Sequence, residues 1–237
     1  MKKHLFPVIT MTLALCLLLC SCGGVSKEKV SGNLTPVETA APTETAAPTE
    51  EKSVSMGLLE GGTYENSYAG FGFTLDESWI LYPAEQIQTL PENIREMFQG
   101  TELENYEYTQ FTDVLAENPE TLTTMNVLYQ QIKLQERLAY AVMTEEALID
   151  ATLAQSEPMA QAYANAGIAV ESMEKKTVTF LGQEHVALYT VAAVQDIPYY
   201  ILQIYNYHLG DYGIILTVGS YVEDNTESLL ELYYSVK

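Results

Sequence analysis

The stretch Thr177–Val222 decides the fold, and it reads TVTFLGQEHVALYTVAAVQDIPYYILQIYNYHLGDYGIILTVGSYV. Short turn-forming stretches rich in glycine and acidic residues separate apolar runs of strand length. The expected strands cover 177–181, 185–194, 199–208 and 212–222. Because connections this short join antiparallel neighbours, the stretch predicts an antiparallel meander. Both faces of 199–205 are largely apolar, which indicates a sheet that is covered on both sides.

Upstream of the meander, the pattern alternates between strands and helices. Alternating apolar residues predict strands, and apolar residues at helical spacing predict one or two short helices. In chain order, the expected elements are strands over 70–75 and 79–82, helices within 83–100, and strands over 113–116 and 123–133. Residues 134–143 are ambiguous, because helix-forming residues stand beside a strand-like Tyr140-Ala141-Val142.

A longer helical stripe begins at Thr144, whose hydroxyl suits an N-cap and is followed by two glutamates that suit the helix dipole. Pro158 interrupts the stripe and predicts either a kink or a second helix capped by Ser156. Gly167 is expected to end the element. Asp224 and Glu227 resemble a capping box that opens a last helix, in which Leu229, Leu230 and Tyr233 are the expected buried set.

The order of these elements predicts the fold class. Strands come first, then helices, strands, a long helical stripe, the meander and a terminal helix. This order is typical of an α+β domain with an antiparallel central β-sheet and helices packed on it.

The N-terminus carries the pattern of a bacterial lipoprotein signal. Lys2 and Lys3 precede an apolar, uncharged run that is too short for an ordinary membrane span and ends in Leu19-Cys20-Ser21-Cys22. Residues 1–21 are therefore expected to be a signal peptide, cleaved between Ser21 and Cys22. Cys22 is expected to become a diacylglyceryl cysteine with fatty acyl chains such as palmitate. An ordinary secretory signal with chance cysteines is the alternative.

The expected lipid on Cys22 would hold the protein on the extracytoplasmic face of the bacterial cell membrane, within the cell envelope. Residues 22–62 are rich in Thr, Pro, Glu and Ala and repeat the hexapeptide Glu-Thr-Ala-Ala-Pro-Thr at 38–43 and 44–49. Such a composition cannot bury enough apolar area to offset its ordering entropy, so the segment is expected to be a disordered spacer. The globular domain is expected to cover 63–237.

Charge and cysteine content exclude several functions. The chain has 32 acidic against 11 basic residues, and loss of Lys2 and Lys3 would leave nine basic ones. Nucleic acid is therefore not an expected partner, because phosphate binding needs clustered Lys and Arg. All three cysteines lie at or before Cys22, so disulfides, thiolate catalysis and cysteine-based zinc sites are not expected in the domain. No cofactor and no metal ion is expected.

Tyrosine supplies the candidate binding face. Six tyrosines lie on the last two strands of the meander, which are expected to be neighbours. Tyr199, Gln203, Tyr205 and Tyr207 fall on one face of the first of these strands. Tyrosine is enriched at recognition surfaces, because it offers a large contact area and a polar tip. The competing interpretation is that these side chains pack under helices.

Some of these elements resemble a known fold. An aromatic-Gly-aromatic strand followed by Trp79, written Gly70-Phe71-Gly72-Phe73-Thr74-Leu75 with Trp79 behind it, is similar to the opening of PsbP-like domains. The Gly182 hairpin, the Gly-Asp-Tyr turn at 210–212 and the terminal helix continue the resemblance. It covers about 64–237 and implies an α-β-α sandwich. The chain also resembles uncharacterised lipoproteins of gut Gram-positive bacteria that carry this domain. Known PsbP-like proteins share no catalytic residues, so no residue role carries over.

No catalytic motif stands out in the sequence. His185 and His208 are the histidines beyond the signal, and neither belongs to a paired metal-ligand spacing. We therefore expect a protein that is not an enzyme: a lipid-anchored binding module, or a scaffold for an envelope complex with a protein partner. One alternative is a binder of a soluble ligand or glycan that uses the tyrosine face. A hydrolase of envelope material would need two carboxylates brought together from distant segments.

Overall fold

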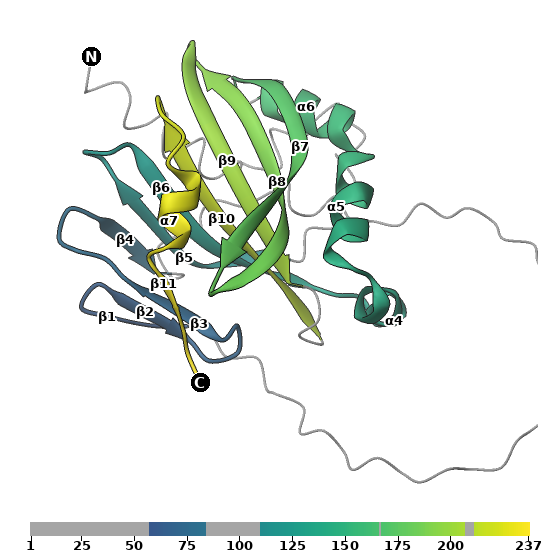
Figure 1. The fold of residues 1–237 in the computed structure, drawn as a ribbon, viewed down its shortest axis with the longest axis horizontal. Helices are drawn as coiled ribbons and strands as arrows, with labels where there is room; N and C mark the ends of the chain where they lie inside the picture. Colours follow the sequence, from purple (N-terminus) through teal and green to yellow (C-terminus); the bar gives the residue numbers. More distant parts are fainter. Residues whose placement is uncertain (1–56, 84–109, 166, 207–210) are drawn as a thin grey trace, which may run out of the picture.

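The computed structural model describes residues 57–83, 110–165, 167–206 and 211–237 (Figure 1). These residues form eleven strands and four helices. The strands are β1 (Leu58–Glu60), β2 (Thr63–Asn66), β3 (Phe71–Thr74), β4 (Ile80–Pro83), β5 (Gln110–Asn118), β6 (Thr123–Gln131), β7 (Ile168–Phe180), β8 (Gln183–Val194), β9 (Ile197–Asn206), β10 (Tyr212–Tyr221) and β11 (Tyr233–Ser235). The helices are α4 (Leu134–Val142), α5 (Glu145–Leu153), α6 (Ser156–Asn165) and α7 (Thr226–Leu230).

Two antiparallel sheets organise the domain. The larger one has seven strands in the order β4-β5-β6-β10-β9-β8-β7. The smaller one has four strands in the order β1-β2-β3-β11, so that the last strand of the chain pairs with one of the first. Tight hairpins explain the pairing of β7 with β8 and of β8 with β9, whereas β10 joins β6 across a long stretch of sequence.

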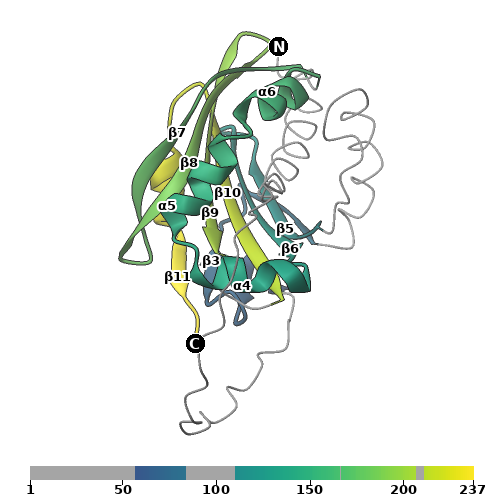
Figure 2. The same ribbon diagram turned by 90° about the vertical axis from the view of Figure 1, so that its right-hand side faces the viewer.

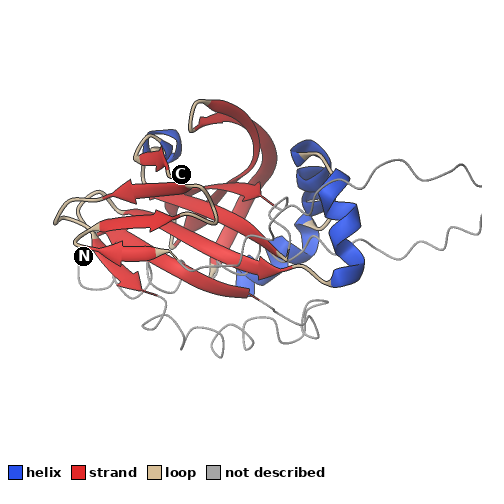
Figure 3. Ribbon diagram, turned by 90° about the horizontal axis from the view of Figure 1, so that it is seen from below, coloured by secondary structure: helices blue, strands red, loops and turns tan. Residues whose placement is uncertain are grey.

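Helices α4, α5 and α6 cover one face of the large sheet (Figure 2). Their buried side chains, among them Tyr140, Ile149 and Tyr163, form one core with Tyr199, Tyr205 and other residues of that face. Viewed from below, the three helices gather on one side of the strands (Figure 3). Because α5 and α6 each bury one stripe, their other sides stay polar.

The small sheet and α7 cover the opposite face. Phe71 and Phe73 of β3, Leu229 of α7 and Tyr233 of β11 pack there against Val127, Leu202 and other side chains of the large sheet. Alternate residues of each central strand thus enter different cores, which explains why β6, β9 and β10 are buried on both sides. The prediction of cover on both sides of the sheet is confirmed.

The α+β class with an antiparallel central sheet and helices packed on it is also confirmed. The expected meander corresponds to β7–β10. The ambiguous segment 134–143 forms helix α4. The stripe after Thr144 divides at Ala154-Gln155 into α5 and α6, so that Pro158 lies in the first turn of the second helix. The Thr144 hydroxyl accepts a hydrogen bond from the amide of Ala147 at 3.2 Å, as an N-cap does.

Three expected boundaries need correction. The domain does not start at residue 63, because Leu58–Glu60 pairs with Thr63–Glu65 and the chain is already held at Gly57. Strand β7 begins at Ile168 rather than 177, since an edge strand tolerates the charged residues of 171–176. The terminal helix is short, and Tyr233 is buried in strand β11 beyond it. The helices expected within 83–100 fall mostly outside the described residues.

Candidate functional site

A cleft opens where β8 separates from β9. The register between the two strands runs from Val194 paired with Ile197 to Leu188 paired with Gln203. Beyond that pair, β8 continues with β7 to the hairpin turn at Leu181-Gly182, whereas β9 continues with β10 to Asn206. The β7–β8 hairpin thus leaves the sheet, as its curvature in Figure 1 shows. The gap between the two pairs of strands becomes a cleft.

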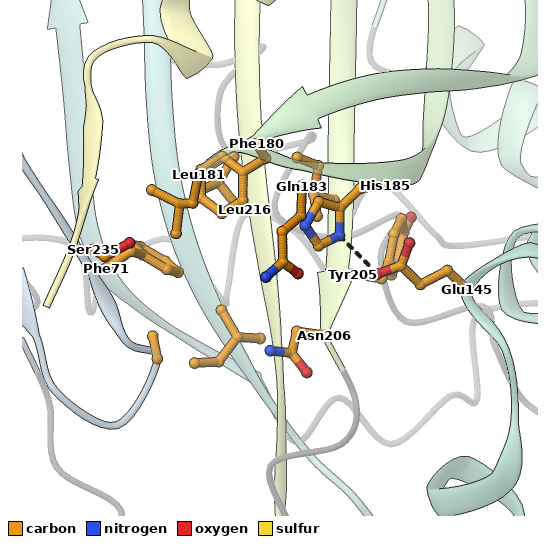
Figure 4. Close-up of a pocket in the computed structure, with 13 residues that line it drawn as sticks. Phe71, Glu145, Phe180, Leu181, Gln183, His185, Tyr205, Asn206, Leu216 and Ser235 are labelled. Atoms are coloured by element: carbon orange, nitrogen blue, oxygen red, sulfur yellow. Dashed lines mark hydrogen bonds and ion pairs between the residues drawn. The ribbon is translucent and has the colours of Figure 1, made fainter. Parts of the chain in front are cut away.

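The cleft has a volume of about 430 Å³, within the range of small-molecule sites (Figure 4). Apolar side chains supply most of its wall: Ala69, Phe71, Phe180, Leu181, Ile204, Ile214 and Leu216. Polar groups come from Glu145, Gln183, His185, Tyr205, Asn206 and Ser235. The wall therefore combines residues from α5, the hairpin, the central strands and the small sheet, which no short sequence motif contains.

A histidine–carboxylate pair lies at one end of the cleft. His185 Nδ1 is 2.7 Å from Oε1 of Glu145, and the backbone amide of Val186 donates to Oε2 of the same carboxylate at 2.9 Å. Helix α5 places Glu145 there, because Thr144 caps its first turn while Leu148 and Ile149 pack into the core under the helix. Both oxygens of Glu145 are thus occupied by groups of β8, and both side chains are partly buried.

The other ring nitrogen of His185 lies on the side of Gln183 in Figure 4, while Asn206 approaches from the opposite wall. Among the described residues that line the cleft, none is a lysine or an arginine, and Glu145 is the single carboxylate. The electrostatic character of the cleft is therefore neutral to negative. An apolar wall with a few convergent polar groups is the usual composition of a ligand site.

The predicted tyrosine face is wrong as an exposed surface. Tyr199, Gln203 and Tyr205 are each no more than 3% exposed, because helices α5 and α6 cover that face of β9. Tyr199 stacks on Tyr221 at 4.2 Å between ring centroids, and Gln203 donates to the hydroxyl oxygen of Thr217 at 3.2 Å. Tyr205 also lines the cleft. Tyr207 lies outside the described residues.

A second polar cluster lies between the two sheets and is buried away from the cleft. The Oδ2 of Asp113 accepts hydrogen bonds from the Gly57 amide (2.8 Å), the Tyr64 hydroxyl (2.6 Å) and the Asn66 side chain (3.0 Å). Burial raises the pKa of Asp113, and these three donors offset part of that increase. Burial beside the carboxylate also holds the pKa of Tyr64 well above its usual value. The cluster joins the start of the domain to β5.

Several predictions remain untested. Ser21 and Cys22 lie outside the described residues. Among the described residues, no group of three or more His, Cys, Asp and Glu side chains is arranged to hold a metal ion. None of the helices in the described part of the chain has the length and apolar character that a membrane span requires.

Sequence reasoning missed the pairing of Glu145 with His185. Glu145 was recognisable as an acid in the first turn of a helix, and His185 as the start of a strand. The two residues are 40 positions apart, and they meet because α5 packs on β8. No local signal could have revealed the pair.

A comparison with known protein families and with curated proteins found no match.

Proposed function

We propose that this protein is a lipid-anchored extracytoplasmic binding domain that does not act as an enzyme. The cleft between β8 and β9 carries the proposal, because it unites apolar walls with a few polar groups in a volume suited to a small ligand. The lipobox at Cys22 and the spacer after it support the anchoring on the outer face of the cell membrane.

The resemblance to PsbP-like domains supports a binding role, because such domains share no catalytic residues. The α-β-α sandwich that the resemblance implies belongs to the same proposal. A hydrolase with paired carboxylates is less favoured, since Glu145 is the single carboxylate among the described residues that line the cleft. A glycan site on the tyrosine face is abandoned, because Tyr199 and Tyr205 are buried.

A ligand screen tests the proposal. The mature chain, residues 22–237 with Cys22→Ser so that no lipid is added, is screened by ligand-observed NMR against small amphiphilic molecules. Gln183→Trp should block binding, because Gln183 is exposed and lines the cleft. Glu184→Trp is the matched control, since the next residue of the strand is exposed but points to the other face. Equal binding by both variants would place the ligand elsewhere.

The exposed face of α4 favours a second function, the scaffold of an envelope complex. Leu134, Leu138 and Val142 recur at every fourth residue, and their exposed fractions are 75%, 83% and 83%. They form an apolar stripe that points outward. The acidic charge of the chain suits a protein partner with an apolar, basic surface better than an anionic lipid surface.

Site-specific photo-crosslinking in intact cells tests this second function. A photoreactive residue in place of Leu138 should capture one reproducible protein, whereas the same residue in place of Glu223, which is exposed two residues beyond β10, should not. Recovery of the uncrosslinked protein from both positions, with efficient photolysis, would contradict the scaffold function.

A further inference from the structure

The arrangement of hydrogen bonds around Glu145 determines what His185 offers to a ligand. A carboxylate only accepts hydrogen bonds, and Oε1 of Glu145 lies 2.7 Å from Nδ1 of His185. A neutral His185 must therefore carry its proton on Nδ1. Its Nε2 is then an acceptor, and among the described residues no hydrogen bond to this nitrogen is found. A fixed tautomer of this kind is how a carboxylate orients a histidine in many sites.

The rest of the cleft adds two requirements. The apolar wall that includes Phe71, Phe180 and Leu216 needs a ligand with an apolar body, since its burial supplies the driving force. The described residues of the lining include no lysine or arginine that could pair with an anion, and burying an unpaired anion beside Glu145 is unfavourable.

Resting on the proposed binding function, we propose that the cleft selects neutral or cationic amphiphiles that donate a hydrogen bond to Nε2 of His185. Glu145 is the positioning residue, because it holds the imidazole in the tautomer that accepts. The ligand's apolar body lies among Phe71, Phe180 and Leu216, and its N–H or O–H group lies against the histidine (Figure 4).

The variant Glu145→Gln separates the tautomer from the shape of the cleft. In the wild type, the Val186 amide donates to Oε2 of Glu145 at 2.9 Å. The amide oxygen of the glutamine is expected to accept the same hydrogen bond in the variant. The NH₂ group then replaces Oε1 and donates to Nδ1, which moves the histidine proton to Nε2. The variant thus changes Nε2 from an acceptor to a donor with almost no change in volume.

NMR of ¹⁵N-histidine-labelled mature chain at pH 8 tests the tautomer directly, because histidine ordinarily titrates well below this pH. The wild type should show a protonated Nδ1 and an unprotonated Nε2 for His185, and Glu145→Gln should show the reverse. A His208→Gln sample assigns the two histidines of the mature chain. A wild-type His185 protonated on Nε2 would overturn the inference.

Indole and 1-methylindole test the ligand class, since both have an aromatic body and only indole donates an N–H hydrogen bond. The wild type should bind indole about 2- to 10-fold more tightly, the value of one hydrogen bond. In Glu145→Gln the ratio should fall to about one. Tryptamine should bind the wild type more tightly than indole-3-propionate, because the first is a cation and the second an anion.

The outcomes distinguish the two proposals. If none of the four probes binds the wild type and the ligand screen also finds no molecule that Gln183→Trp blocks, the proposed function fails. If the probes bind in the cleft but the wild type does not distinguish indole from 1-methylindole, or prefers indole-3-propionate, the binding function stands and the selectivity is overturned.

Discussion

Two buried tyrosines differ in what their hydroxyl groups contact. The Tyr64 hydroxyl donates to Asp113, whereas the hydroxyl of Tyr233 is buried and finds no hydrogen-bond partner within the described part of the chain. Burial alone holds the pKa of Tyr233 far above its usual value. A buried polar group without a partner costs about 1–3 kcal/mol, so the same substitution should have opposite effects at the two positions.

We expect Tyr233→Phe to raise the free energy of unfolding by about 1 kcal/mol, because it removes a hydroxyl that gains nothing in the folded state. Tyr64→Phe should lower it by about 2 kcal/mol, because Asp113 loses a donor. Urea denaturation of the mature chain measures both values. A loss of stability in Tyr233→Phe would indicate that its hydroxyl has a partner after all.

Asp113 makes stability depend on pH. Its pKa is raised in the folded state, so its contribution is most favourable below pH 4 and is lost as the pH rises through the folded pKa. Asp113→Asn keeps an oxygen for the three donors and does not titrate. We therefore expect this variant to gain stability relative to the wild type between pH 4 and pH 7, as measured by urea denaturation at each pH.

Asp113→Ala is the matched control for this pH dependence. It leaves the Gly57 amide, the Tyr64 hydroxyl and the Asn66 amide without their acceptor, and should cost about 3 kcal/mol at both pH values. If Asp113→Asn instead loses stability relative to the wild type as the pH rises, the folded pKa of Asp113 lies below its ordinary value.

Single residues of the candidate site were the least predictable part of the molecule. Composition identified His185 as one of few histidines, but its partner Glu145 depends on how α5 packs on β8. The prediction that the tyrosine face is exposed was wrong for a related reason. Alternation places Tyr199 and Tyr205 on one face correctly, yet it does not tell which face a helix covers.

At the level of elements, α4 differs from the usual amphipathic helix, because its apolar stripe faces solvent instead of the core. Tyr140 points into the core, whereas Leu138 is 83% exposed. Leu138→Ala should therefore change the free energy of unfolding by less than about 0.5 kcal/mol. Tyr140→Ala should lower it by about 3 kcal/mol, because it leaves a cavity beneath the helix. Thermal and urea unfolding compare the two. A large loss in Leu138→Ala would show that the stripe is covered within the domain.

Elements with apolar residues on both faces and short flanking turns could be predicted well, as β6, β8, β9 and β10 show. Elements at the edge of a sheet could not. Residues 171–176 of β7 include Glu171, Glu174 and two lysines, and the strand geometry there comes from pairing with β8. Strand β2 was missed for a different reason: it is short and largely polar in sequence, and its geometry comes from pairing with β1 on one side and β3 on the other.

At the scale of the whole molecule, the pairing of strands that are far apart in the sequence holds the fold together. The last strand pairs with β3, where Tyr233 lies opposite Phe73, and the Val236 amide donates to the Gly70 carbonyl at 2.9 Å. Tyr233 also packs edge-on against Phe180 at the tip of the β7–β8 hairpin. The end of the chain thus fixes the small sheet against the hairpin that forms the cleft.

Removal of residues 232–237 should therefore destabilise the whole domain by about 4 kcal/mol, since the aromatic cluster around Phe71, Phe73 and Phe180 loses Tyr233. Tyr234→Ala is the control, because the Tyr234 side chain bonds Glu65 at the surface. It should cost less than about 1 kcal/mol. Urea denaturation of the mature chain measures both, and a truncated chain as stable as the wild type would contradict this role for β11.

The α+β class followed from the order of the elements, and hairpin pairings followed from short turns. The pairing of β10 with β6 and of β11 with β3 did not, because both join strands that are far apart in the sequence. Their partners are selected by the packing of both cores at once. The same non-local joining creates the cleft.

The bond from the Gly57 amide to Asp113 also has a mechanical meaning in the tethered chain that we propose. Within the described part of the chain, a pull from the membrane would first reach Gly57, directly before the short strand β1. Three residue pairs hold β1 at the edge of the small sheet, and such a strand peels away one pair at a time under load. The Asp113 cluster lies ahead of that strand and would bear the force first. The cluster would therefore prevent tension on the tether from separating β1 from the sheet and unfolding the domain.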